Sequence, residues 1–493
     1  MTTTAAVRYE TVIGIEVHAQ LLTLSKMFCA CPVPSLDSPP NSHVCPVCLG
    51  MPGVLPVINK HAVELTIMTG LAVNCDIPPE AKFDRKNYHY PDLMKGYQIS
   101  QYDLPLCKDG RLEIEVDGQT KRVGITRVHL EEDTAKSMHV AAPTGESYSL
   151  IDVNRSGLPL MEIVSEPDIR SAEEARAYLQ KLRQVLRYIG ASRANMDEGN
   201  MRCEPNVSIR PLGSEPFGQK VELKNINSFK HAYDAIKYEV ARQTQVIESG
   251  GRVAQETRGW REDLGQSVSQ RSKEYANDYR YFPEPDLPTL TISREWVEEI
   301  RTRMPELADA KERRFQDQYG LSAYDAAVLA ETRARADFFE ASVALGGNDN
   351  PARAKSAANW INGEFARLLN ADNADIEDSK VTPELLSELL DLLDAGTISG
   401  KTAKDVFEQV YRAGISPKRA VQESGLIQIT SADEVSFAVE KVIQEHAKPV
   451  EDYRRGKEEA IKFLVGQVMR ETKGRARPDI VIQVLKEKLN GSP

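Results

Sequence analysis

Residues 12–21, VIGIEVHAQL, alternate apolar and polar side chains with a period of two. Successive side chains of a β-strand point to opposite faces, so this pattern predicts a strand with one buried and one polar face. The buried face would contain Ile13, Ile15, Val17, Ala19 and Leu21. The polar face would carry Glu16, His18 and Gln20.

Three later segments repeat this design: ITRVHLEED (125–133), EPNVSIRP (204–211) and KVELKN (220–225). Their polar positions are Arg127, His129 and Glu131, then Glu204, Asn206, Ser208 and Arg210, then Lys220, Glu222 and Lys224. One reading is an antiparallel sheet whose polar face simply meets water. The other is a divalent-cation site, because converging carboxylates with a histidine suit Mg²⁺ and nearby Arg and Lys suit phosphate.

The stretch MFCACPVPSLDSPPNSHVCPVCLG (27–50) holds four of the seven cysteines, Cys29, Cys31, Cys45 and Cys48. Two short cysteine pairs joined by a loop match the spacing of zinc ligands. Four thiolates leave no open coordination position, so the site would be structural. Two alternatives stay open: four neighbouring thiols without a metal, and His43 in place of one cysteine.

Length and charge limit the classes of protein to consider. A chain of 493 residues predicts two or three domains, and its net charge of −11 argues against a basic coat for indiscriminate nucleic-acid binding. No apolar run reaches the roughly 18 residues of a membrane span, and no secretory signal precedes the first strand. We therefore expect a cytoplasmic protein with no membrane contact.

The proline-rich string FPEPDLPT (282–289) separates two kinds of periodicity. Alternation dominates before it, and helical spacing dominates after it. We expect an α+β protein: a large domain built on a mostly antiparallel sheet (1–294), an all-α middle domain (295–420) and a small helical tail domain (421–493).

Tyrosines and basic residues interleave in FDRKNYHYPDLMKGYQISQYD (83–103). Tyr88, Tyr90 and Tyr97, together with Lys86 and Lys95, would suit stacking on unpaired bases while the cations meet phosphates. The alternative is that these rings pack the loop against the sheet.

Several long strings resemble the B subunit of the tRNA-dependent amidotransferase, the GatB family. They include EVHAQLLTLSKMFCACP, CPVCLGMPGVLPVIN, HLEEDTAK, DVNRSGLPLMEIVSEPDIRS, MRCEPNVSIRP, ELKNINSF and DYRYFPEPDLP. The resemblance spans the chain, because KEEAIKFLVGQVMRETKGRARPDIV (457–481) is similar to the YqeY-like tail of the same family.

The resemblance implies a ligase that makes Gln-tRNA(Gln) or Asn-tRNA(Asn) from misacylated Glu-tRNA(Gln) or Asp-tRNA(Asn). ATP with Mg²⁺ would phosphorylate the side-chain carboxylate, and ammonia from a glutaminase A subunit would then attack it. A small C subunit would complete a heterotrimer. The alternative from another class is a zinc-containing RNA-binding module without catalysis.

The resemblance also assigns residues. It implies magnesium and active-site roles for Glu16, His18, Glu131 or Glu132, Glu204 and Glu222, and structural zinc ligation by Cys29, Cys31, Cys45 and Cys48. Strand parity favours Glu131 over Glu132 as the metal ligand. In the tail it implies tRNA contact by Arg470, Lys473, Arg475 and Arg477, for which a solvated basic face is the alternative.

Overall fold

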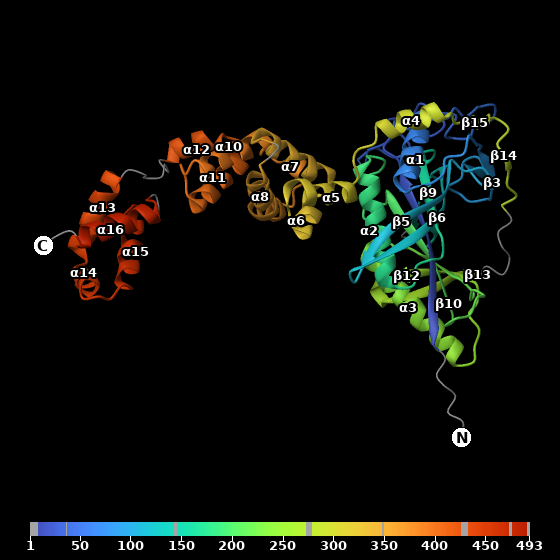
Figure 1. Cartoon of the computed structure of the whole chain (residues 1–493). Helices are drawn as coiled ribbons and strands as arrows, with labels where there is room; N and C mark the ends of the chain where they lie inside the picture. The colour runs from blue at the N-terminus through green and yellow to red at the C-terminus, as the bar shows by residue number, and fades with distance from the viewer. Residues whose placement is uncertain are drawn as a thin grey trace, which may run out of the picture. The chain divides into compact units, whose positions relative to one another are not determined.

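The computed structural model of the chain describes residues 8–35, 37–141, 145–272, 279–347, 350–424, 432–472 and 476–490. The chain forms two compact units, Met1–Leu307 and Ala308–Pro493. Among the described residues, strands occur in the first unit, and the named elements of the second are helical (Figure 1). The predicted α+β class is confirmed.

The main sheet of the first unit has eight strands. Their spatial order is β13 (Gln266–Ser272), β12 (Glu256–Arg261), β11 (Val221–Lys224), β10 (Met201–Pro211), β1 (Tyr9–Gln20), β9 (Pro159–Ser165), β6 (Gln119–Glu132) and β5 (Cys107–Val116). All neighbours are antiparallel except β11 and β12. The four segments predicted from alternation are therefore β1, β6, β10 and β11 of one sheet.

Strand β1 lies inside this sheet, between β10 and β9. Its odd-numbered residues Ile13, Ile15, Val17 and Ala19 are at most 1% exposed. The intervening Glu16 and His18 are partly exposed on the opposite face. The buried methyl groups thus set which face of β1 the polar residues occupy.

Three helices bury the apolar face: α1 (Lys60–Ala72), α2 (Ala172–Tyr188) and α3 (Phe229–Glu248). Figure 1 shows α2 and α3 along one side of the sheet. Each helix begins at a residue whose side-chain oxygen accepts a first-turn N–H, namely Asn59, Ser171 or Ser228. A fourth helix, α4 (Arg294–Thr302), packs against α1.

Smaller sheets flank the main one. They are β14 (Phe282–Pro283) with β3 (Asp84–Asn87) and β4 (Tyr97–Ser100), β15 (Leu290–Thr291) with β2 (Glu80–Ala81), and β7 (Lys136–Ala141) with β8 (Ser147–Asp152). Short helical turns are η1 (Val153–Arg155) and η2 (Glu262–Leu264). Strand β4 packs against the end of β6, where Gln98 Nε2 donates a hydrogen bond to the Glu132 carbonyl at 2.7 Å.

The second unit contains two separate hydrophobic clusters. The first is built by α5 (Ala308–Tyr319), α6 (Ala323–Leu329), α7 (Arg333–Leu345), α8 (Pro351–Trp360), η3 (Ile361–Phe365), α9 (Ala366–Asp372), η4 (Ile376–Asp378), α10 (Pro383–Asp394), α11 (Gly400–Ala413) and α12 (Pro417–Ser424). The second is built by α13 (Ala432–Glu445), α14 (Ala447–Arg454), α15 (Ala460–Glu471) and α16 (Pro478–Asn490). The division at residues 294 and 420 stays a prediction. Within the described residues, none of the helices combines the length and apolar character needed to cross a bilayer.

The three isolated cysteines lie in the core of the first unit, as expected for small apolar side chains. Cys75 lies so close to Gly110 of β5 that a β-carbon added there would be 2.4 Å from its Sγ and 2.9 Å from the Val73 carbonyl. Glycine is therefore required at position 110 by packing.

We predict that Gly110→Ala lowers the free energy of unfolding by about 1–3 kcal/mol, because the Val73 carbonyl cannot move away without weakening the 2.7 Å hydrogen bond that it accepts from the Arg111 N–H. Thermal unfolding of the full chain would measure it. Gly14→Ala is the matched control, since its β-carbon would meet its nearest neighbour at 3.7 Å. Equal melting temperatures for the two variants would contradict the packing argument.

Candidate active site

The polar face of the main sheet carries its charged residues in register across neighbouring strands. Glu16 of β1 lies directly opposite Glu204 of β10. His18 lies opposite Arg202 of β10 on one side and Glu162 of β9 on the other. Glu162 in turn pairs with His129 of β6. The antiparallel register therefore brings together residues that are far apart in the sequence.

One group of possible metal ligands consists of His18, Glu131 and Glu162, whose ligand atoms all lie within 4.8 Å of one another. His18 Nε2 lies 3.5 Å from Glu131 Oε1 and 3.5 Å from Glu162 Oε2. On its other side, the Glu162 carboxylate lies 3.2 Å from His129 Nε2. Two carboxylates and one imidazole form a donor set that a divalent cation would accept.

The second group consists of Glu16, Glu204 and Glu222, with ligand atoms again within 4.8 Å. Lys224 Nζ donates to Glu204 Oε2 at 2.8 Å and lies 3.7 Å from Glu222 Oε1. The two groups are neighbours, because Glu16 and His18 are two residues apart on β1, about 7 Å along the strand. All-oxygen ligands are those that Mg²⁺ prefers.

The electrostatics of the two groups reflect crowded negative charge. Burial, reinforced by the charges of Glu162 and Glu204, raises the pKa of the Glu16 carboxyl. Burial opposes protonation of His18, but its hydrogen bond with Glu162 and the surrounding carboxylates prevail and raise its pKa to about 9. Burial likewise opposes ionisation of Glu162, yet His129 and His18 hold its pKa well below its usual value. An added cation would relieve the repulsion around Glu16, and at the histidine group it would have to displace the proton of His18.

Glu131 and Glu132 occupy opposite faces of β6. Glu131 joins the histidine group, and its Oε2 accepts from Ser100 Oγ at 3.4 Å. Glu132 is turned away: its Oε1 accepts the backbone N–H of Ile99 at 2.9 Å and forms an ion pair with Lys95. The geometry therefore favours Glu131 as a ligand and gives Glu132 partners in the fold.

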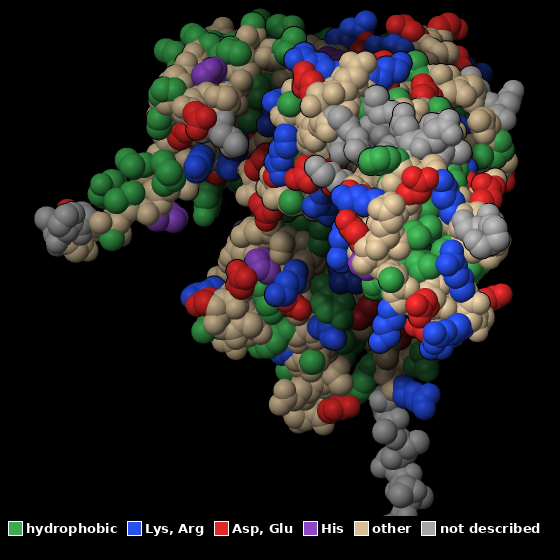
Figure 2. All heavy atoms as spheres, turned by 90° about the vertical axis from the view of Figure 1, so that its left-hand side faces the viewer, with side chains coloured by type: hydrophobic (Ala, Val, Ile, Leu, Met, Phe, Trp, Pro, Cys, Tyr) green, Lys and Arg blue, Asp and Glu red, His purple; other side chains and the backbone are tan. Residues whose placement is uncertain are grey.

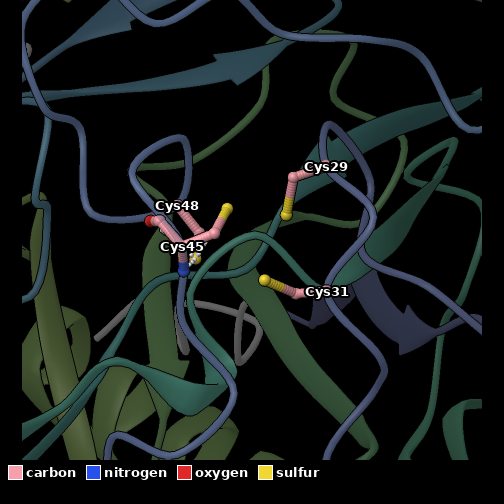
Figure 3. Close-up of side chains that lie close together, drawn as sticks. All are labelled: Cys29, Cys31, Cys45 and Cys48. Atoms are coloured by element: carbon pink, nitrogen blue, oxygen red, sulfur yellow. Dashed lines mark hydrogen bonds between the residues drawn. The ribbon is translucent and has the colours of Figure 1, made fainter.

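The four cysteines of residues 29–48 converge. Figure 3 shows the sulfur atoms of Cys29 and Cys31 directed toward Cys45 and Cys48, and all four lie within 4.8 Å of one another. A tetrahedral zinc site with Zn–S bonds of about 2.3 Å places its sulfurs about 3.8 Å apart, so the cluster fits. The Cys45 N–H donates to Cys48 Sγ at 3.1 Å.

The thiol of Cys48 is more acidic than an ordinary cysteine thiol. Its hydrogen bond with Cys29, the Cys45 N–H and the charge of Lys26 outweigh burial and lower its pKa to about 4. His43 is not part of the cluster, and its Nδ1 lies 3.0 Å from Ser42 Oγ. The cluster can therefore hold a metal through sulfur alone.

The predicted base-stacking residues separate into two environments. Lys86 is half-buried with its Nζ 5.0 Å from the ring centre of Tyr279 and 5.7 Å from that of Tyr88. Burial disfavours its charge, but Glu131 and Glu162 prevail and raise the Lys86 pKa. Lys86 and Tyr88 therefore face the histidine group.

Lys95 instead lies beside Glu132, and Tyr97 lies beside Arg85. Lys95 pairs with Glu132, and the Arg85 guanidinium lies 4.2 Å above the Tyr97 ring. Tyr90 is 64% exposed and remains open to solvent. The contact of these five residues with tRNA stays a prediction.

The basic tail residues are only partly described. Arg470 lies at the end of α15, and Arg477 Nε donates to Asp479 Oδ1 at 3.1 Å. Lys473 and Arg475 lie outside the described residues. Across the face seen in Figure 2, Lys and Arg are intermixed with Asp and Glu rather than gathered in one large patch.

Sequence reasoning missed Glu162, which the structure places at the centre of the histidine group. A signal was present, because Met161 and Ile163 are buried on the core face and Glu162 alternates between them. It also missed Asp133, whose buried carboxylate accepts from Arg202 Nη2 at 2.9 Å and Gln20 Nε2 at 3.0 Å. Nothing local in the sequence predicts that contact.

Two family models match the chain. A model described as the GatB/GatE catalytic domain matches residues 11–298, and one described as the GatB domain matches residues 337–489. The first range contains the polar face and the cysteine cluster.

Full-length relatives are also similar. The B subunit of the aspartyl/glutamyl-tRNA(Asn/Gln) amidotransferase of Carboxydothermus hydrogenoformans is 55% identical over 98% of this chain and 99% of its own length. Proteins of the same name from Dehalococcoides mccartyi and Thermomicrobium roseum are 53% and 54% identical, again over 98% of this chain and 99% of their own lengths. The chain therefore belongs to the GatB/GatE family of amidotransferase subunits.

Proposed function

We propose that this chain activates the side-chain carboxylate of Glu-tRNA(Gln), Asp-tRNA(Asn) or both, using ATP, so that ammonia can convert it to an amide. The names of its relatives, which refer to aspartyl/glutamyl-tRNA(Asn/Gln), support the substrate class. The observation that carries the proposal is the pair of adjoining carboxylate groups on one face of the sheet.

The proposed chemistry explains why such a face is needed. A carboxylate is a poor electrophile, so its oxygen would first attack the γ-phosphorus of ATP and release ADP. Ammonia nitrogen would then attack the acyl carbon of the resulting acyl phosphate, and inorganic phosphate would leave. Mg²⁺ bound at this face would neutralise phosphate charge as it develops.

We assign the magnesium ligands to both groups. Glu16, Glu204 and Glu222 would form one site, and His18 with Glu131 the other, to which the geometry adds Glu162. Lys86 and Lys224 border these groups, so their ammonium groups would meet phosphate oxygens.

The tRNA and the partner subunits complete the proposal. Exposed Tyr90 suits stacking on the unpaired acceptor end, with Tyr88 and Lys86 nearer the carboxylates and Lys95 and Tyr97 supporting the loop. Arg470 and Arg477, with Lys473 and Arg475, would contact the body of the tRNA. A glutaminase A subunit would supply ammonia, and a small C subunit would complete the heterotrimer.

We further propose that Cys29, Cys31, Cys45 and Cys48 hold one structural Zn²⁺. The mutual proximity of the sulfur atoms and the absence of any non-sulfur ligand among the described neighbours support this assignment. A four-thiolate site is closed to substrate, so its contribution would be to the fold of the loop.

Glu16→Gln or Glu222→Gln should lower tRNA-stimulated ATP hydrolysis by about 100-fold or more, because each removes a ligand charge where phosphate is handled. Binding of misacylated tRNA should change little. The assay uses the assembled complex with each charged tRNA, and exposed Glu113→Gln on β5 is the matched control. Unchanged turnover would favour an RNA-binding module instead.

Glu131→Gln and Glu132→Gln should have different effects on metal binding and on stability. The first should weaken Mn²⁺ binding, measured by electron paramagnetic resonance with Mn²⁺ in place of Mg²⁺, while leaving the melting temperature nearly unchanged. The second should lower the melting temperature, because it weakens the ion pair of half-buried Lys95. The reverse pattern would show that Glu132 is the ligand.

The purified chain should contain one zinc per molecule by elemental analysis. Cys31→Ser with Cys45→Ser should abolish that zinc and lower the melting temperature, because metal binding stabilises only the folded state. Cys203→Ser, which alters a buried cysteine outside the cluster, should retain full zinc. Zinc retained by the double variant would refute the assignment.

A further inference from the structure

Lys26 is a fully buried lysine in the loop that precedes Cys29. Its side chain is 0% exposed. Among the described residues, its Nζ has one hydrogen-bond partner, the Val153 carbonyl at 3.3 Å, and no carboxylate forms an ion pair with it. A buried ammonium with a single neutral partner is costly, and a nearby anion would lower that cost.

The cysteine cluster lies beside Lys26. The Lys26 side chain and Cys48 both pack against Gly157: a β-carbon built on Gly157 would lie 3.6 Å from Lys26 Cδ and 3.7 Å from Cys48 Cβ. The backbone ties Lys26 to the same cluster, because its N–H donates to the Cys31 carbonyl at 2.9 Å.

The charges of the two groups are complementary. Four thiolates around Zn²⁺ carry a net charge of −2, and placing that charge among partly buried cysteines is unfavourable as well. Each group lowers the cost of burying the other. Surface lysines could not do this, because water would screen them.

We propose that Lys26 is the buried counter-charge of the zinc–thiolate cluster, and that it strengthens zinc binding electrostatically without being a ligand. The proposal rests on the zinc site assigned above. It makes an asymmetric prediction: Lys26 should stabilise the zinc-loaded protein more than the metal-free one, because zinc binding holds all four cysteines as thiolates beside it.

The test compares Lys26→Met with the wild-type chain, since methionine keeps most of the apolar stem and removes the charge. We expect zinc affinity, measured by competition with a zinc-chelating dye, to fall about tenfold or more. We expect Lys26→Met to lower the melting temperature of the zinc-loaded chain more than that of the chain freed of zinc with a chelator. Exposed Lys230→Met on α3 is the matched control and should change neither value.

The outcomes are distinguishable. Zinc affinity within twofold of the wild type, or an equal drop in the melting temperature of Lys26→Met with and without zinc, would mean that Lys26 serves packing alone and would overturn the proposal. A wild-type chain that binds no zinc would refute the site itself. If Lys26→Met does not fold, Lys26→Arg, which keeps the charge, must retain zinc affinity and Lys26→Gln must lose it.

Discussion

Burial of Ile13, Ile15 and Val17 on one face of β1 is the constraint on which the candidate site depends. With those side chains in the core, Glu16 and His18 must emerge on the other face, and a slip of one residue would exchange the two sets. Strands β10 and β9 then align Glu204 and Glu162 with them. Hydrophobic burial therefore supplies the free energy that holds the carboxylates together.

The repulsion between these neighbouring carboxylates needs to be compensated by positive charge. Lys224 neutralises part of the group around Glu16, and His18 and His129 share the charge of Glu162. The fold thus tolerates the cluster before any cation binds, at the cost of shifted protonation. That is the behaviour expected of residues kept for chemistry rather than for stability.

The parts of the structure predicted from the sequence are those set by local periodicity. Alternation in four segments gave the correct faces of β1, β6, β10 and β11, and cysteine spacing gave the thiol cluster. The position of Glu162 depends on which strand pairs with β1, and Asp133 meets Arg202 only through the fold. Parity alone favoured Glu131 over Glu132. It could not predict that Glu132 accepts the backbone N–H of β4, because that partner belongs to another strand. Long-range pairing is therefore the part that local patterns do not specify.

The placement of β1 within the sheet also has a consequence for biosynthesis. Its partners β9 and β10 begin at Pro159 and Met201, so the ribosome must add well over a hundred further residues before β1 can pair on either side. At about 5–20 residues per second this takes from several seconds to tens of seconds. During that time the apolar face of β1 and both of its unpaired edges are exposed, a state in which chaperones commonly shield a nascent chain.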